Sequence, residues 1–228
     1  MKKLIWAIFA AVVVFNCPLA HADSVTANIT ADNAFSYWDG STWVAAGNNW
    51  QIPGSYAINH VGSPDMVYIA VQNYTGDSGN PAALLASFTD PTGTFTQTGT
   101  HTLLSNSSVA WQVFVQPTAT WISNPFLDPT TLIGGVTPTS YGANSDTSTI
   151  WNEVNGGPIS GIDPNAEWIW TANNDQNYDS PGQDNFAIFS ADLSVNSPLV
   201  TPEPPTFLLF AFAAAMIVLL MRRKLALV

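Results

Sequence analysis

Residues 34–45, AFSYWDGSTWVA, place an Asp-Gly pair between two runs of aromatic, small and β-branched residues. Asp39 and Gly40 are residue types that tight hairpin turns favour, because these turns hold the backbone at positive φ. The flanking runs suit strands, since aromatic and β-branched side chains pack well on a pleated sheet. We therefore expect antiparallel strands at 34–38 and 41–45, joined by a tight turn.

Short runs of the same kind recur along the chain, between loops rich in Gly, Pro, Asn, Asp and Ser. No window of about 11 residues within 23–195 shows a convincing helical period, which would place apolar residues three and four apart. The other expected strands are 25–30, 55–60, 66–72, 82–89, 109–115, 166–171 and 186–193. Many short strands with turn-rich loops are typical of an all-β, antiparallel β-sandwich, which we expect as an ectodomain at residues 23–195.

The first 22 residues have the features of a signal peptide. The charged start Lys2-Lys3 precedes an apolar stretch at residues 4–15, and small residues frame the expected cleavage after Ala22. The apolar stretch is short for a bilayer span, which needs about 20 residues. Cleavage would also remove Cys17, the single cysteine of the chain. We therefore expect a mature protein without disulfides or cysteine metal sites.

The charges are divided between the ends and the middle of the chain. All five Lys and Arg residues lie within residues 1–3 or 222–224. Asp and Glu total 16, and Glu203 alone follows residue 200, so 15 acidic residues lie between Asp23 and Val200. Binding to nucleic acid or anionic lipid needs cations that face phosphates, which disfavours both for this segment. The acidity fits either solubility through mutual repulsion or neutralisation by divalent cations.

The C-terminal tail has three parts. Residues 196–205, NSPLVTPEPP, form a Pro-rich linker, which favours an extended chain. Residues 206–228 combine an apolar segment with the basic cluster Arg222, Arg223 and Lys224. Basic residues stay on the cytoplasmic side of a membrane. A transmembrane helix here would therefore leave residues 23–205 outside, in agreement with the signal peptide.

Pro202-Glu203-Pro204, followed at once by the apolar segment and the basic cluster, resembles the PEP-CTERM sorting tail. Thr201 departs from the pattern, because valine is frequent at that place. The resemblance implies that exosortase, a membrane protease of Gram-negative bacteria that make exopolysaccharide, processes the chain. It also implies that Pro202, Glu203 and Pro204 are the recognition and cleavage region. The inner-membrane anchor would then be transient, and the protein would pass to the cell surface or extracellular matrix.

Several stretches of the ectodomain resemble, in order and spacing, the galactose-binding-like jelly-roll modules of bacterial surface proteins and glycosidases. They are TADNAFSYWDG, NNW, VYIAVQN, NPAALLASF, VAWQVF, NAEWIWTAN and NFAIFSADL, within residues 25–193. The resemblance implies a jelly-roll sandwich, and such modules often carry a structural calcium ion. A long insert from Thr118 to Asn165 departs from the pattern, so no ligand contact is transferred from the family.

Tryptophans are the first candidates for a binding site. Trp43, Trp121 and Trp151 stand in turn-rich contexts, and exposed rings there would stack on sugars; packing in the core is the alternative. Trp168 and Trp170 lie two residues apart on an expected strand. We expect both on one face of that strand, in the core between the sheets.

Oxygen-bearing side chains are concentrated in residues 173–185, NNDQNYDSPGQDN. The carboxylates of Asp175, Asp179 and Asp184 are hard ligands of the kind that Ca²⁺ prefers, although their spacing is not that of an EF-hand. An ordinary turn-rich loop is the alternative. A structural calcium ion is therefore one of two interpretations of this segment.

Patterns for catalysis are weak. Glu153, Asp163 and Glu167 form a close acidic set of the kind that a glycan hydrolase uses, but their spacing matches no motif. Solvated loop residues are the simpler interpretation. Residues 76–79, GDSG, match the segment around the nucleophile of chymotrypsin-like proteases, yet His60 lies too near in sequence to serve as the base of that fold.

Five threonines alternate with other residues in Thr92–Thr100, TGTFTQTGT. On one strand all five hydroxyls would lie on one face, and such a ladder can match an ice lattice. An exposed strand or an O-glycosylated segment is the alternative. The whole sequence predicts a non-enzymatic, exported surface protein that is adhesive or binds exopolysaccharide. A secreted glycan hydrolase is the first alternative and an ice-binding protein the second.

Overall fold

The structure of the protein is a computed structural model that describes residues 25–58, 65–74, 81–116, 124, 127–173 and 185–196. The expected signal peptide, the end of the linker and the transmembrane segment lie outside these residues. Within the ranges just given, no helix has the length and apolar character needed to cross a bilayer. The described residues form antiparallel sheets, which confirms the expected all-β class.

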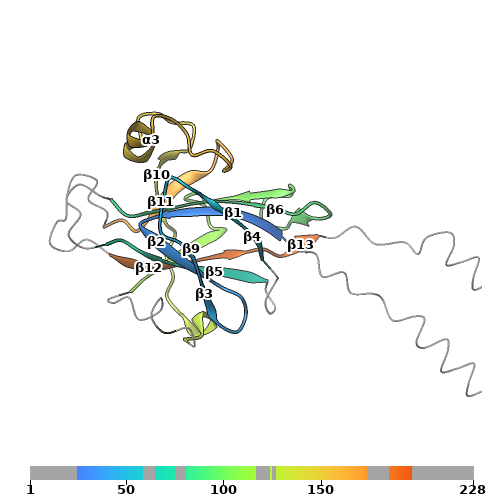
Figure 1. Ribbon diagram of the computed structural model, residues 1–228. Coiled ribbons are helices and arrows are strands. Elements are labelled where there is room, and N and C mark those ends of the chain that lie inside the picture. Colours follow the sequence, from blue (N-terminus) through green and yellow to red (C-terminus); the bar gives the residue numbers. More distant parts are fainter. Residues whose placement is uncertain are drawn as a thin grey trace, which may run out of the picture.

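Two sheets face each other and form a β-sandwich (Figure 1). Sheet A contains, in spatial order, β10 (Thr139–Ala143), β11 (Glu167–Trp170), β6 (Ala83–Thr89), β1 (Val25–Asp32) and β4 (Gly54–Ile58), with β8 (Thr102–Leu104) also paired to β6. Sheet B contains β3 (Trp43–Gly47), β2 (Ala34–Trp38), β5 (Met66–Gln72), β12 (Phe186–Asp192) and β9 (Trp111–Val115). A separate pair consists of β13 (Val195–Asn196) and β7 (Thr94–Phe95).

The strands expected from the sequence are all present, with ends that differ by no more than about two residues. The hairpin closes on a Trp38–Trp43 pair between β2 and β3. Its turn is held by the Asp39 carboxylate, which accepts hydrogen bonds from the backbone N–H groups of Ser41 and Thr42 at 2.8 Å each. Gly40 has φ 102°, which is the positive φ that the sequence predicts there.

Apolar side chains from both sheets fill the space between them. Val25, Ala27 and Ile29 of β1 alternate with outward-facing residues and are fully buried. Ile69 of β5 and Phe189 of β12 meet them from sheet B. Full burial of a large apolar side chain contributes about 1.5–3 kcal/mol. Burial of such side chains along the strands of both sheets holds the sandwich together.

The insert that begins at Thr118 covers the outer faces of both sheets. Its residues 127–136, here called the arm, lie against sheet B, where Val136 pairs with Val113 of β9. Its residues 143–166, here called the capping lobe, contain α3 (Ile150–Asn155) and lie over sheet A (Figure 1). Because the capping lobe covers sheet A, β6 is buried on both faces.

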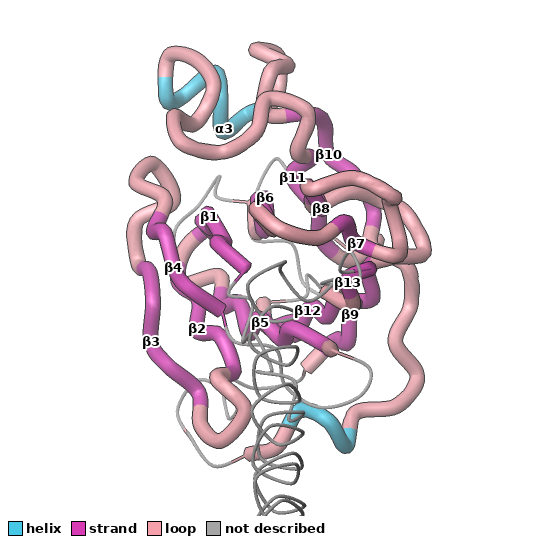
Figure 2. The backbone as a smooth tube through the Cα atoms, turned by 90° about the vertical axis from the view of Figure 1, so that its right-hand side faces the viewer, coloured by secondary structure: helices cyan, strands magenta, loops and turns pink. Residues whose placement is uncertain are grey.

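The edges of the two sheets meet along one side of the molecule. β4 and β3 run beside each other there, while β9 and β13 lie on the opposite side (Figure 2). The hydroxyl of Tyr56 on β4 donates a hydrogen bond to the carbonyl of Ala46 on β3 at 3.0 Å. This bond joins two strand edges that would otherwise offer unpaired backbone groups to other chains.

The expectation that Trp168 and Trp170 share one face is wrong, although both are buried as expected. Trp168 stacks on Trp151 under the capping lobe, whereas Trp170 packs against Phe189 of sheet B with ring centroids 5.5 Å apart. β11 is only four residues long, and its pairing with β10 shifts register between Ser140 and Ala143. The extra residue of this shift lies in β10, while Trp168 and Trp170 of β11 belong to two different apolar clusters.

The threonine run at residues 92–100 does not form one strand, which corrects the expected ladder. Thr94 lies in β7, and the chain then turns back, with the N–H of Phe95 donating to the carbonyl of Thr100 at 2.8 Å. Phe95 is fully buried and Gly99 has φ 67°. These two residues make the run turn back on itself, because one anchors it in the core and the other permits the reversal.

Candidate functional site

Trp43 does not form an exposed platform, which corrects the expectation from its turn-rich context. It is 6% exposed and lies on the outer face of sheet B, under the arm. Its indole N–H donates to the carbonyl of Leu127 at 2.7 Å, and its ring meets that of Trp38 in a T-shaped contact with centroids 5.6 Å apart. The insert covers the face that would otherwise have left this ring in water.

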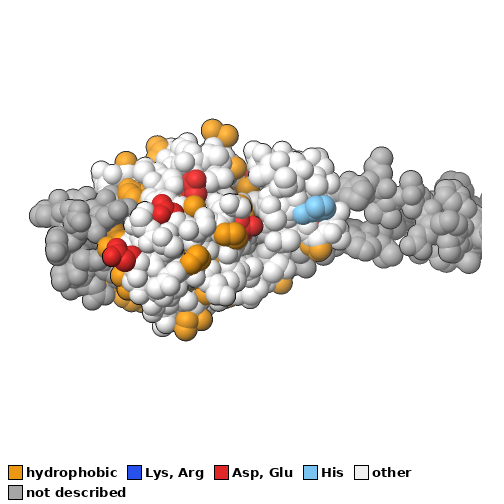
Figure 3. Space-filling view, turned by 90° about the horizontal axis from the view of Figure 1, so that it is seen from above, with side chains coloured by type: hydrophobic (Ala, Val, Ile, Leu, Met, Phe, Trp, Pro, Cys, Tyr) orange, Lys and Arg blue, Asp and Glu red, His pale blue; other side chains and the backbone are white. Residues whose placement is uncertain are grey.

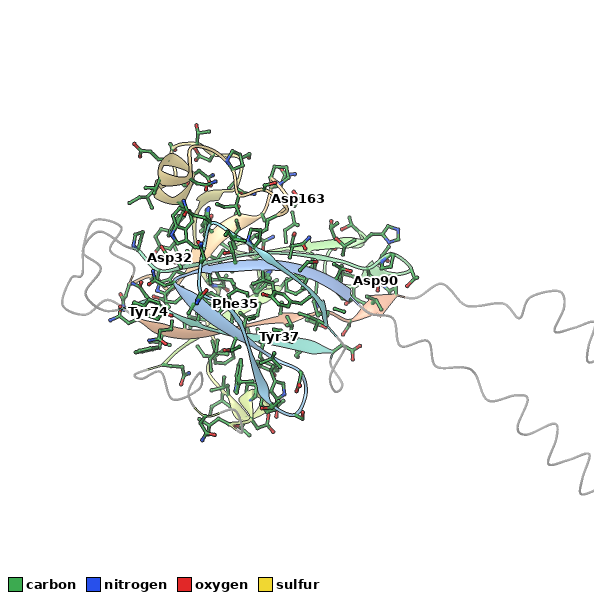
Figure 4. All side chains as sticks on the ribbon, in the orientation of Figure 1. Asp32, Phe35, Tyr37, Tyr74, Asp90 and Asp163 are labelled. Carbon is green, nitrogen blue, oxygen red and sulfur yellow. The ribbon has the colours of Figure 1, made fainter. Side chains whose placement is uncertain are left out.

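Trp151 is also buried, at 2% exposure, which agrees with the alternative of packing in the core. It lies in the first turn of α3 and stacks on Trp168 with centroids 4.7 Å apart and ring planes 19° apart. Its indole N–H donates to the Asp32 carboxylate at 3.0 Å. Figure 4 shows Asp32 at sheet A, beneath the capping lobe. Trp151 therefore fastens the capping lobe to the sheet, while Trp121 lies outside the described residues.

Trp50 is the described tryptophan that remains half-buried, since the other six are at most 6% exposed. It lies in the loop at residues 48–53, between β3 and β4, and the sequence did not single it out as a platform. Its ring meets Trp168 in a T-shaped contact, with centroids 6.3 Å and planes 73° apart. The hydroxyl of Thr30 on β1 donates to the Trp50 carbonyl at 2.8 Å. The sequence does contain one sign of a binding site here, because Trp50 is preceded by Asn48 and Asn49 and followed by Gln51, which all carry carboxamides.

Three asparagines stand side by side at one end of sheet B. Asn33 precedes β2, Asn73 follows β5 and Asn185 precedes β12, and these three strands are neighbours. The N–H of Asn33 donates to the carbonyl of Gln72, and the N–H of Asn73 to that of Asn185, both at 2.9 Å. The Asn33 side-chain oxygen accepts from the N–H of Tyr74 at 2.6 Å. The register therefore gathers three carboxamides at this end.

The Asn185 side-chain oxygen is buried and receives no hydrogen bond from the described residues. A buried acceptor without a donor costs about 1–3 kcal/mol, so this atom has capacity for a further partner. Asp175, Asp179 and Asp184, the expected calcium ligands, precede it in the chain and lie outside the described residues. Among the residues that are described, no group of three or more His, Cys, Asp or Glu side chains is placed to hold a metal ion.

Two members of the acidic set considered for hydrolysis accept hydrogen bonds from backbone N–H groups. Asp163 accepts from the N–H of Asn165 at 2.8 Å and lies on the capping lobe (Figure 4). Glu167 accepts from the N–H of Ser107 at 3.2 Å. Glu153 is exposed on α3. The GDSG segment at residues 76–79 and His60 lie outside the described residues.

Carboxylates in the described domain are held by hydroxyl and N–H groups, because residues 25–196 contain no Lys or Arg. The N–H of Thr42 is the main cause that lowers the pKa of Asp39. The hydroxyl and N–H of Ser148 lower the pKa of Asp146. Burial raises the pKa of Asp192, but hydrogen bonds from Ser194 and Gln97 outweigh it, so that this pKa is also lowered.

Comparison of the chain with protein-family models, with curated proteins and with solved structures finds no match.

Proposed function

We propose that the chain is an exported, non-catalytic surface protein that is sorted through its C-terminal tail and binds exopolysaccharide. The observation that carries the proposal is the tail itself: Pro202-Glu203-Pro204, an apolar segment, and then Arg222, Arg223 and Lys224. The signal peptide gives the same topology, because both place residues 23–205 outside the inner membrane. Exosortase is the proposed processing partner, and the cell surface or extracellular matrix is the proposed destination.

The proposal includes a jelly-roll arrangement of the galactose-binding-like kind for the sandwich. Two five-strand paths of antiparallel strands support it, as does the crossing of the chain from sheet A to sheet B between β1 and β2. The insert from Thr118 to Asn165 would be an addition to that arrangement. It supplies β10, the arm and the capping lobe.

Sorting is tested by production of the chain in a Gram-negative host with and without an exosortase. Cleavage near residues 202–204 should release a domain whose new C-terminus mass spectrometry locates in this region. Glu203→Ala should leave the full-length chain in the inner membrane, whereas Thr201→Val should be processed as well as the natural chain. Equal processing with and without exosortase would remove this part of the proposal.

A structural calcium ion is proposed at the asparagine end of sheet B. The buried oxygen of Asn185 supports it, because carboxamide oxygens are hard ligands that Ca²⁺ accepts. Thermal melts should be compared in calcium and in EDTA at one fixed ionic strength. A higher melting temperature in calcium that is absent in Asn185→Ala is the expected result, and identical melting temperatures would refute the site.

A secreted glycan hydrolase is the alternative function, and release of reducing ends from neutral polysaccharides would support it over simple binding. Ice binding has lost the observation that suggested it, since the run at Thr92–Thr100 turns back on itself and does not form one strand. Absence of ice recrystallisation inhibition would remove that alternative altogether.

A further inference from the structure

A half-buried aromatic ring lies where a loop meets the capping lobe. Trp50 belongs to the loop at residues 48–53 and also joins the apolar cluster beneath the capping lobe. The lobe approaches this loop closely, because a Cβ added to Gly161 would lie 3.6 Å from Cγ of Pro53. Trp50 therefore lies between the two chain segments, and the residue is only partly buried.

The ring is held in place before any ligand arrives. The Thr30 hydroxyl fixes the Trp50 carbonyl at 2.8 Å, and Thr30 is itself 1% exposed. The T-shaped contact with Trp168 occupies at most one face of the Trp50 ring. For a ligand that stacks on the other face, the free-energy cost of ordering the ring would be small, which favours binding.

The residues next to Trp50 in the loop carry neutral groups that donate and accept hydrogen bonds. Asn48 and Gln51 are exposed, and a carboxamide offers two donors and one acceptor oxygen. Asn49 has a structural role, because its side-chain oxygen accepts from the N–H of Gln51 at 3.0 Å. The loop at residues 48–53 contains no charged residue.

We propose that Trp50, with Asn48 and Gln51, forms a binding site for a neutral pyranose glycan. The apolar face of a sugar ring would stack on the indole, and its hydroxyls would pair with the two carboxamides. The inference rests on the proposed function, since it names the place and the ligand class of the glycan binding proposed there.

Charge selects the ligand class. Between Asp23 and Val200 the chain carries 15 acidic residues and no Lys or Arg, so uronate or sulfate groups would be repelled. Figure 3 shows acidic and scattered hydrophobic side chains on the face seen from the side of the capping lobe. Neutral glycans avoid this repulsion, and their binding should depend little on salt.

The test uses the full-length chain in lauryldimethylamine oxide micelles, because this detergent carries no sugar. Cellohexaose, laminarihexaose and mannohexaose are titrated by calorimetry, with an oligogalacturonate of equal length as the acidic comparison. At least one neutral hexasaccharide should bind, and the oligogalacturonate should bind at least ten times more weakly. Trp50→Ala should weaken binding at least tenfold, and Trp50→Phe, which keeps an aromatic face, by less.

Two further variants keep the test sound if Trp50→Ala fails to fold. Asn48→Ala and Gln51→Ala remove only exposed carboxamides and should each weaken binding about threefold to tenfold. Ile52→Ala is the matched control, because Ile52 is 70% exposed in the same loop, and its affinity should not change. Binding that survives Trp50→Ala in a folded chain would overturn this site and leave glycan binding intact. A natural chain that binds none of the hexasaccharides would overturn the glycan binding itself, and preference for the oligogalacturonate would overturn the ligand class.

Discussion

Asp32 is a carboxylate with no solvent exposure, and Trp151 donates its indole N–H to it across the boundary between sheet A and the capping lobe. Trp151→Phe keeps an aromatic ring on Trp168 but removes this donor. We expect the free energy of unfolding to fall by about 1–3 kcal/mol, because a buried acceptor loses a hydrogen bond. Urea denaturation measures the change. Val154 on the same helix is 65% exposed, so Val154→Ala should change stability by less than about 0.5 kcal/mol. Equal losses of stability in the two variants would contradict this role of the Trp151 hydrogen bond.

Asp192 shows how a domain without Lys or Arg keeps its carboxylates ionised. Hydrogen bonds from Ser194 and Gln97 lower its pKa below the ordinary value, despite partial burial that raises it. A carboxyl group with a lowered folded-state pKa adds stability above its unfolded pKa, about 3.9, and this stability is lost as the pH falls through the folded value. We expect stability that is level near neutral pH and declines below about pH 4.

Ser194→Ala tests this account of Asp192. The variant should raise the pKa of Asp192 in an NMR titration and cost about 0.5–1 kcal/mol at pH 6, allowing for the partial exposure of the pair. The difference from the natural chain should vanish once both are fully protonated. Ser107→Ala removes an exposed hydroxyl elsewhere and serves as the control. If the pKa of Asp192 did not change in this variant, the Ser194 hydroxyl would not be a cause of its lowered value.

At the scale of elements, Gly142 joins β10 to the capping lobe. It lies at the register shift of β10, has φ 110°, and an added Cβ would stand 2.5 Å from Cγ2 of Thr149, the N-cap of α3. Gly142→Ala should destabilise the protein by about 2–4 kcal/mol through backbone strain and displacement of the cap. Gly99→Ala, also at positive φ but with open space around it, should cost about 1 kcal/mol. Thermal or urea unfolding of both variants compares the two, and equal losses would mean that the contact with Thr149 carries no strain.

Elements with a clear local pattern were predictable from the sequence, and elements that depend on distant partners were not. The hairpin at Asp39-Gly40 and the alternating strand β1 follow from turn chemistry and period-two burial. β10 was missed because Gly142 interrupts its pattern and β11 alone pairs with it. The threonine run alternates as a strand would, and nothing local shows that Phe95 is buried in the core.

The candidate site was harder to predict because exposure is a property of the whole chain. Trp43 and Trp151 stand in turn-rich sequence, yet Trp43 is buried under the arm and Trp151 against sheet A, through contacts 84 and 119 residues apart in sequence. Trp50 is only partly buried against the apolar cluster beneath the capping lobe. Local sequence gives the residue types that bind a sugar, whereas the insert decides which of them reach solvent.

For the molecule as a whole, the absence of Lys and Arg from residues 25–196 sets the response to salt. Like charges repel throughout the domain, and the screening length falls from about 30 Å at 0.01 M salt to about 10 Å at 0.1 M. We therefore expect the melting temperature to rise by several degrees between about 10 and 300 mM NaCl. A domain held by ion pairs would respond in the opposite direction, because salt weakens their attraction.

KCl and LiCl should match NaCl at equal ionic strength, since screening depends on ion charge and not on ion identity. A melting temperature that falls with salt would mean that repulsion among the carboxylates does not limit stability. The hydrogen bonds to Asp39, Asp146 and Asp192 would then be enough to offset the charge of these carboxylates.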